Sequence, residues 1–209
     1  MFQQFAIFLQ TNNTFVMKKL FISLFLITCA LISFAQNESE HLTFKGVPID
    51  GTLREYVEKM KNAGFEYVGE ENKTANLQGE FAGFKECTIV VSTLKFKDLV
   101  NSIGVIFPAN EKWWGVENDY NKLKSMLVQK YGEPSECVEK FKGYTPDTDS
   151  AKKLKLRNDE YSWFSTFTTP KGNIQLSVAY QSTIGCFVTL KYSDKINTES
   201  IRSHAINDL

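Results

Sequence analysis

Histidine is scarce in this chain of 209 residues. Only His41 and His204 are present, and both lie near the ends of the segment expected to fold. Chain termini are often poorly ordered, so neither side chain is expected to share a site with the core. This scarcity argues against a Ser-His-Asp triad and against a histidine-rich metal site.

The motifs of common catalytic and cofactor sites are also missing. The sequence contains no Gly-x-Ser-x-Gly elbow, no His-Glu-x-x-His pair, no phosphate-binding loop and no dinucleotide fingerprint. We therefore expect no cofactor and no metal ion. The missing motifs argue against an enzyme, and whether the protein is one stays open at this point.

Cysteine is sparse as well. Outside the N-terminal region, Cys87, Cys137 and Cys186 follow each other at intervals of 50 and 49 residues, whereas zinc sites need closely spaced pairs. In an oxidising compartment two of the three can form a disulfide, and Cys137–Cys186 is the favoured pair because both lie in the C-terminal half. The alternative is three buried thiols that act as small apolar residues.

Neither sign of charge is in excess. The chain has 24 basic and 24 acidic residues, and residues 1–36 contain two lysines and no acid, which leaves 22 against 24 and a net charge of −2 for the rest. A nucleic-acid partner would need a basic patch. We therefore expect no nucleic acid among the partners.

Long apolar runs are absent too. The longest, Leu20–Ile32, has thirteen residues, whereas a membrane-spanning helix needs about 20. It follows Met17-Lys18-Lys19 and precedes Ser33-Phe34-Ala35, which is the three-part pattern of a secretory signal peptide. This predicts export to the periplasm or beyond, with no membrane span after cleavage.

The signal peptide divides the N-terminal region. We expect an upstream extension over 1–16, the signal peptide over 17–35 and a disordered mature start over 36–42. One alternative is an uncleaved anchor that also uses Phe2–Leu9. Another is a lipid anchor through Cys29, held by two or more acyl chains, although Thr28 fits a lipobox poorly.

Helix signals occur twice in the remaining chain. Thr52 and Glu55 form a capping box before a helix over 53–63, whose apolar residues recur at helical spacing. A second helix is predicted over 118–131 and ends at Gly132. A third, short helix is expected over 194–208.

Each of the first two helices precedes a series of short strands. Strands are predicted at 65–68, 77–84, 87–93 and 100–107, then at 136–141, 160–168, 174–180 and 186–192. Gly79 and Gly83 predict bulges or close backbone approach, and 143–155 is expected to be a charged loop.

The order of elements predicts an α+β fold. Two tandem units of the α-β-β-β type, over 43–110 and 111–209, would form one compact domain with the helices packed on one face of the antiparallel sheets.

Three stretches carry a resemblance. Phe44–Gly51, Gly79–Phe84 and Lys130–Ser135 resemble a family of small secreted proteins of unknown function from Bacteroides and relatives. Residues 123–141 are also similar to small domains of outer-membrane-assembly lipoproteins and to β-lactamase-inhibitor-like folds. The first resemblance implies no activity and no site residues.

Two local features are candidates for function. The adjacent Trp113 and Trp114 must point in different directions, and they form either an exposed platform for a peptide or sugar or a plug that packs the second helix on the sheet. Asp149-Ser150-Ala151 resembles the short acceptor motif for O-glycosylation in Bacteroides-like bacteria. The alternative is an ordinary surface loop.

The function expected from the sequence is that of an exported, non-enzymatic binding or interaction module for an envelope protein or a small ligand. One alternative is a hydrolase that uses carboxylates, with four candidates: Glu80, Glu86, Asp159 and Glu160. The other alternative is an inhibitor of a periplasmic enzyme, which rests on fold analogy alone.

Mass spectrometry of the protein purified from its own envelope tests the signal peptide directly. We expect a mature chain that begins at Gln36, because Ser33 and Ala35 place small residues where a signal peptidase cleaves. A chain that begins at Cys29 with attached lipid, or one that still contains residues 1–16, would contradict this prediction. The same spectrum shows whether Ser150 carries a glycan.

Overall fold

The computed structural model describes residues 39–94 and 96–207. The predicted upstream extension, the signal peptide and Cys29 lie outside these residues. Residues from Glu40 onward form one compact unit.

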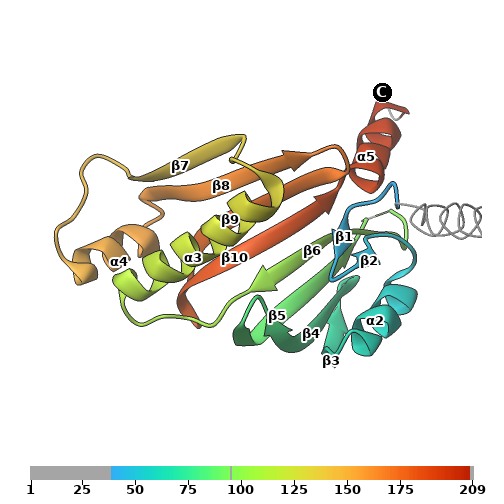
Figure 1. Cartoon of the computed structure of the whole chain (residues 1–209), viewed down its shortest axis with the longest axis horizontal. Helices are drawn as coiled ribbons and strands as arrows, with labels where there is room; N and C mark the ends of the chain where they lie inside the picture. Colours follow the sequence, from blue (N-terminus) through green and yellow to red (C-terminus); the bar gives the residue numbers. More distant parts are fainter. Residues whose placement is uncertain (1–38, 95, 208–209) are drawn as a thin grey trace, which may run out of the picture. The chain divides into compact units, whose positions relative to one another are not determined.

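A single antiparallel sheet of eight strands is the centre of this unit (Figure 1). Its strand order is β3-β4-β5-β6-β10-β9-β8-β7. The strand bounds are β3 Glu66–Glu71, β4 Thr74–Phe81, β5 Phe84–Thr93, β6 Val100–Ile106, β7 Glu136–Phe141, β8 Tyr161–Thr169, β9 Gly172–Gln181 and β10 Gly185–Asp194. A separate two-stranded ribbon, β1 Thr43–Phe44 and β2 Val47–Pro48, precedes it.

Four helices accompany the sheet: α2 Leu53–Asn62, α3 Trp113–Tyr131, α4 Asp149–Arg157 and α5 Lys195–Asn207. Helix α2 packs against β3–β5 and α3 packs against β8–β10, on the same side of the sheet (Figure 1). The predicted α+β class, with two helix-plus-strand units and helices on one face, is confirmed. The capping box of the first helix is also confirmed, since the Thr52 and Glu55 side chains each accept the other's backbone N–H.

The two halves of the sheet are joined by their last strands. Strands β3–β6 run as one meander and β7–β10 as another, and β6 pairs antiparallel with β10 over Ser102↔Ser193 to Ile106↔Thr189. Alternate residues of every central strand face the helices, so one hydrophobic core extends beneath both α2 and α3.

Aromatic clusters fill the core at both ends. Phe44 stacks on Phe81 at a ring-centroid distance of 5.0 Å and meets the edge of Tyr192 at 5.3 Å. In the second half, Trp113 lies 4.9 Å from Trp163 and 5.2 Å from Phe141. Aromatic pairs in these geometries add to the stabilisation from burial.

Helix α3 begins at Trp113, five residues before the predicted start at 118. The reason is a long-range cap: the Asp149 carboxylate of α4 accepts the Trp113 backbone N–H at 2.9 Å. No neighbouring residue provides this bond, because Lys112 makes no side-chain cap. A carboxylate at a helix N-terminus also complements the helix dipole.

The expected loop over 143–155 is wrong in part, because it contains most of α4. Thr148 caps this helix through the Ala151 backbone N–H, and Leu156 is its one fully buried residue. A nine-residue helix with a single buried side chain gives little periodic signal.

The two glycines predicted to mark irregular strand positions have different roles. At Gly79 a Cβ would lie 2.6 Å from the Phe65 ring, and the register of β4 and β5 shifts just beyond it. Gly83 instead lies in the turn between these strands, where its φ of 80° favours glycine.

A buried polar clip holds the end of β10 against the N-terminal segment. The Asp194 carboxylate is fully buried and accepts hydrogen bonds from the backbone N–H groups of Leu42 (2.7 Å) and Asn197 (2.9 Å). His41 Nδ1 lies 3.0 Å from the same carboxylate. The Asn197 amide donates to the carbonyl oxygens of Ile49 and Val100.

Replacing Asn197 with Ala should lower the free energy of unfolding by about 2–4 kcal/mol, because it leaves two buried carbonyl oxygens without their donor. Asn173→Ala is the matched control, since Asn173 is exposed on β9 and should cost less than about 1 kcal/mol. Urea unfolding measures both variants. Equal losses would contradict the role given to the clip.

At two buried tyrosines, replacement by phenylalanine should change the free energy of unfolding in opposite directions. The Tyr56 hydroxyl is buried and has no hydrogen-bond partner within the described part of the chain, and burial raises the pKa of its phenol. Tyr120 shares a buried hydrogen bond of 2.7 Å with Ser165. Tyr56→Phe should therefore raise the free energy of unfolding by about 1 kcal/mol, and Tyr120→Phe should lower it by at least about 1 kcal/mol.

Urea unfolding of the two variants beside the parent chain tests this pair. A loss of stability in Tyr56→Phe, or none in Tyr120→Phe, would show that the hydrogen-bond assignment is wrong.

Candidate functional site

The two faces of the sheet differ in what covers them. On the helix side, alternate residues such as Leu77, Ile89 and Leu176 are fully buried. The intervening residues point to the other side, which we call the open face because α2, α3 and α4 all lie on the opposite side (Figure 1). Most side chains of the open face are exposed or half-buried.

Cross-strand pairing aligns the open-face residues of β4, β5, β6, β10, β9 and β8 in three rows. In that strand order, the rows are Thr74, Ser92, Ser102, Ser193, Asn173 and Thr168; Asn76, Val90, Gly104, Lys191, Gln175 and Thr166; and Gln78, Thr88, Ile106, Thr189, Ser177 and Phe164.

These three rows are poor in charge. Of their eighteen residues, three rows across six strands, only Lys191 is charged, whereas 23% of the whole chain is charged, which would give about four. Hydroxyl and amide side chains make up most of the remainder. Carboxylates flank the rows on the edge strands, with Glu66 and Glu71 on β3 and Glu136 on β7.

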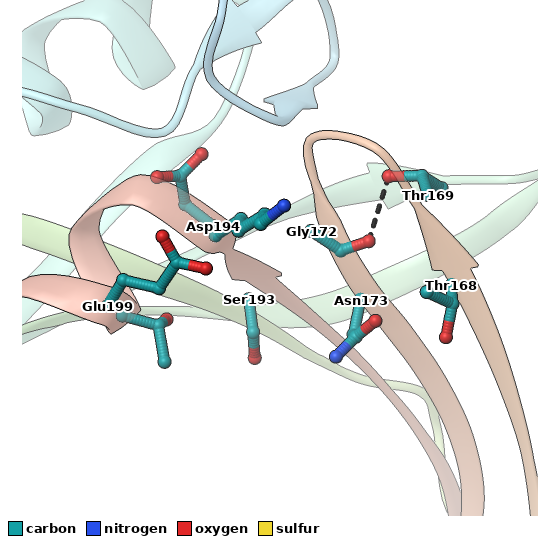
Figure 2. A pocket seen from close by; sticks show the side chains of 9 residues that line it. Thr168, Thr169, Gly172, Asn173, Ser193, Asp194 and Glu199 are labelled. Carbon is teal, nitrogen blue, oxygen red and sulfur yellow. Dashed lines mark hydrogen bonds between the residues drawn. The ribbon is translucent and has the colours of Figure 1, made fainter. Parts of the chain in front are cut away.

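A cavity of about 310 Å³ lies at the end of the first row. Its walls are the ends of β8, β9 and β10 and the first turn of α5. Figure 2 shows Thr168, Asn173 and Ser193 aligned on one side of the three strands. The Thr169 hydroxyl closes the turn by donating to the Gly172 carbonyl oxygen at 2.8 Å.

The cavity lining combines neutral residues with three charged ones, Asp194, Lys195 and Glu199. The Asp194 carboxylate is engaged in the polar clip. No group of three or more potential metal ligands occurs in residues 39–94 and 96–207.

The structure separates the two predicted tryptophans. Trp113 is 1% exposed and belongs to the aromatic core, whereas Trp114 is 63% exposed on the first turn of α3. Adjacent helical residues point about 100° apart, so the pair cannot form one platform. Trp113 is the packing plug, and the prediction of a partner contact rests on Trp114.

The predicted disulfide between Cys137 and Cys186 is not formed. All three cysteines of the described chain are free thiols. Cys137 lies on the edge strand β7, and Cys186 is the second residue of β10, with β8 and β9 between them. At about 4.8 Å per strand, this separation exceeds the Cα distance that a disulfide allows.

Ser150 lies in the first turn of α4 and is exposed. It borders a second, shallower cavity of about 780 Å³, which Lys112, Lys153 and the buried Cys186 also line. The Lys153 ammonium donates to the Glu111 carbonyl oxygen at 2.7 Å. The structure thus brings Ser150 and Cys186 to one cavity on the helix side, next to the start of α3.

The four candidate carboxylates lie in two separate places. Glu80 and Glu86 flank the turn between β4 and β5, whereas Asp159 and Glu160 precede β8, and three strands separate β5 from β8. Glu160 pairs with Lys155 at 2.6 Å, and this hydrogen bond lowers its pKa. The two places therefore do not supply one pair of catalytic acids.

The open-face rows were not predicted from the sequence. Their signal is present as Ser, Thr, Asn and Gln alternating with apolar residues, for example at Gln175, Ser177 and Leu176. Such alternation identifies a solvent-facing side of each strand. It does not show that six strands align these side chains into one patch.

None of the described helices combines the length and apolar character needed to cross a membrane. Comparison of the chain with protein-family models, with curated proteins and with solved structures finds no match.

Proposed function

We propose that the protein is a non-enzymatic binding module that holds a protein partner on its open face. The observation that carries this proposal is the single charge among the eighteen residues of the three rows. Depletion of charge is the compositional mark of the centre of a protein interface. The carboxylates on β3 and β7 would form the polar rim.

The size of the patch supports a macromolecular partner. Six strands about 4.8 Å apart and three rows about 7 Å apart cover roughly 600 Å². A standard protein interface buries about 800 Å² on each partner. The three rows would therefore supply most of one side of such an interface.

Two apolar residues would anchor the contact. Ile106 and Phe164 lie in the third row, separated by Thr189 and Ser177, and both are half-buried. Apolar and aromatic anchors surrounded by polar contacts are typical of the residues that dominate binding energy. The adjacent hydroxyl groups would provide hydrogen bonds with little desolvation of charge.

The alternative functions have less support. A hydrolase needs two acids about 5–10 Å apart, and three strands separate the place that holds Glu80 and Glu86 from the place that holds Asp159 and Glu160. An inhibitor is one kind of protein-binding module, but Phe164 is the sole aromatic residue in the three rows, so these rows do not favour an enzyme cleft as the target. A sugar-binding site would also need more aromatic surface than the three rows provide.

Export would make the partner a protein of the cell envelope. This step depends on the predicted signal peptide over 17–35 and is tested separately by the mature N-terminus.

Substituting Thr189 with Arg tests the proposed surface, because it places a long charged side chain between the proposed anchors Ile106 and Phe164 of the third row. Ser125→Arg is the matched control, since Ser125 is exposed on α3 at the opposite side. Both proteins, and the parent chain, serve as baits at equal loading in envelope extract. Captured proteins are quantified by mass spectrometry.

We expect Thr189→Arg to reduce the captured partner at least about tenfold, because a buried unpaired charge is costly in an interface, while Ser125→Arg leaves capture unchanged. Thermal unfolding shows whether each bait is folded. Equal capture by all three baits, or no protein enriched on the parent chain, would contradict the proposal. Retention of envelope glycan in place of protein would also contradict it.

A further inference from the structure

A cluster of titratable and nucleophilic side chains lies on the helix side, away from the open face. Cys137 and Glu139 come from β7, and Lys124 comes from α3. The Cys137 sulfur lies 3.2 Å from the Lys124 ammonium and 3.3 Å from Glu139 Oε1. Lys124 and Glu139 are themselves 2.6 Å apart. We call these three residues the thiol cluster.

Packing beneath the cluster fixes the sulfur in place. Ser165 is fully buried on β8 and donates from its hydroxyl to Cys137 Sγ at 3.4 Å. The same Ser165 hydroxyl is hydrogen-bonded to buried Tyr120, one helical turn before Lys124. Hydrogen-bonded hydroxyl groups of Ser165 and Tyr120 therefore hold the sulfur on its core side. Cys137 itself is exposed on the edge strand.

An ammonium and a carboxylate both lie next to the Cys137 thiol. Burial favours neutral forms of both partners, but their mutual hydrogen bond and the contact with Cys137 outweigh it. As a result the pKa of Glu139 is lowered and that of Lys124 is raised. At neutral pH a carboxylate and an ammonium thus flank the sulfur. An adjacent ammonium stabilises a thiolate.

The other two described cysteines are buried. Cys87 and Cys186 are 0% and 1% exposed, and desolvation raises the pKa of both thiols. Buried thiols of this kind are inert. They provide internal controls within the same chain.

We propose that Cys137 is a modification site that reacts with small disulfides to form a mixed disulfide. Cys137 Sγ attacks one sulfur of the reagent, a new S–S bond forms and the reagent's own S–S bond breaks. Cys137 loses its proton to solvent before the attack, and the departing thiolate takes up a proton from solvent and leaves as a free thiol. Cys137 is oxidised and the departing sulfur is reduced by the same number of electrons.

The neutral probe 4,4′-dithiodipyridine tests this site without favouring either sign of charge. The full chain reacts with a small excess of probe, and modified peptides are quantified by mass spectrometry over time. We expect Cys137 to react at least about tenfold faster than Cys87 and Cys186. Lys124→Met should slow Cys137 about fivefold or more, because the attacking sulfur loses the adjacent ammonium.

Lys122→Met is the matched control. Lys122 lies on the same helix but faces the Phe84 ring at 4.6 Å, so this variant should react like the parent chain. Lys124→Arg keeps the cation and should stay within about twofold of the parent rate. Equal rates for Lys124→Met and Lys122→Met would overturn the proposal.

A second measurement needs no variant. The rate at Cys137 is compared at pH 7 in the native chain and in the chain unfolded in urea, where the cluster no longer exists. The proposal predicts a faster reaction in the native chain, although its thiol is less accessible. A slower native reaction would show that exposure alone governs Cys137.

Discussion

The pairing of β6 with β10 is the constraint on which the rest of the structure depends. Each half of the sheet has one of these strands as its last, and five consecutive pairs from Ser102↔Ser193 to Ile106↔Thr189 join the halves. Without this ladder, each half would expose an unpaired strand edge, which invites non-native association. With it, one core extends under α2 and α3, and the opposite face becomes continuous across both halves.

The buried clip at the end of β10 completes this junction. Asp194 fixes the backbone of Leu42 and of Asn197, and Asn197 in turn binds the carbonyl oxygens of Ile49 and Val100. Three of these four bonds connect residues about 100 to 150 positions apart in the chain. They also orient the first turn of α5, whose side chains form one wall of the cavity beside the open face. Stability and the shape of the proposed binding surface therefore depend on the same buried groups.

Local patterns in the sequence predicted much of the fold, and what they missed depends on distant residues. The capping box at Thr52 and the alternation in β9 are signals within one element, and both elements formed as expected. The start of α3 depends on Asp149, which is 36 residues away. The thiol cluster likewise forms because α3 lies against β8 and brings Lys124 to Cys137. The open face needed the order of all eight strands, which no local pattern contains.

Site-specific photo-cross-linking in the native cell tests the central claim most directly. A photoreactive phenylalanine analogue would replace Gln175, which is exposed in the second row of the open face, or Gln129, which is exposed on the outer side of α3. The account predicts a discrete protein adduct from position 175 and none from position 129. An adduct from position 129 alone, or the same adducts from both, would contradict a binding surface on the open face.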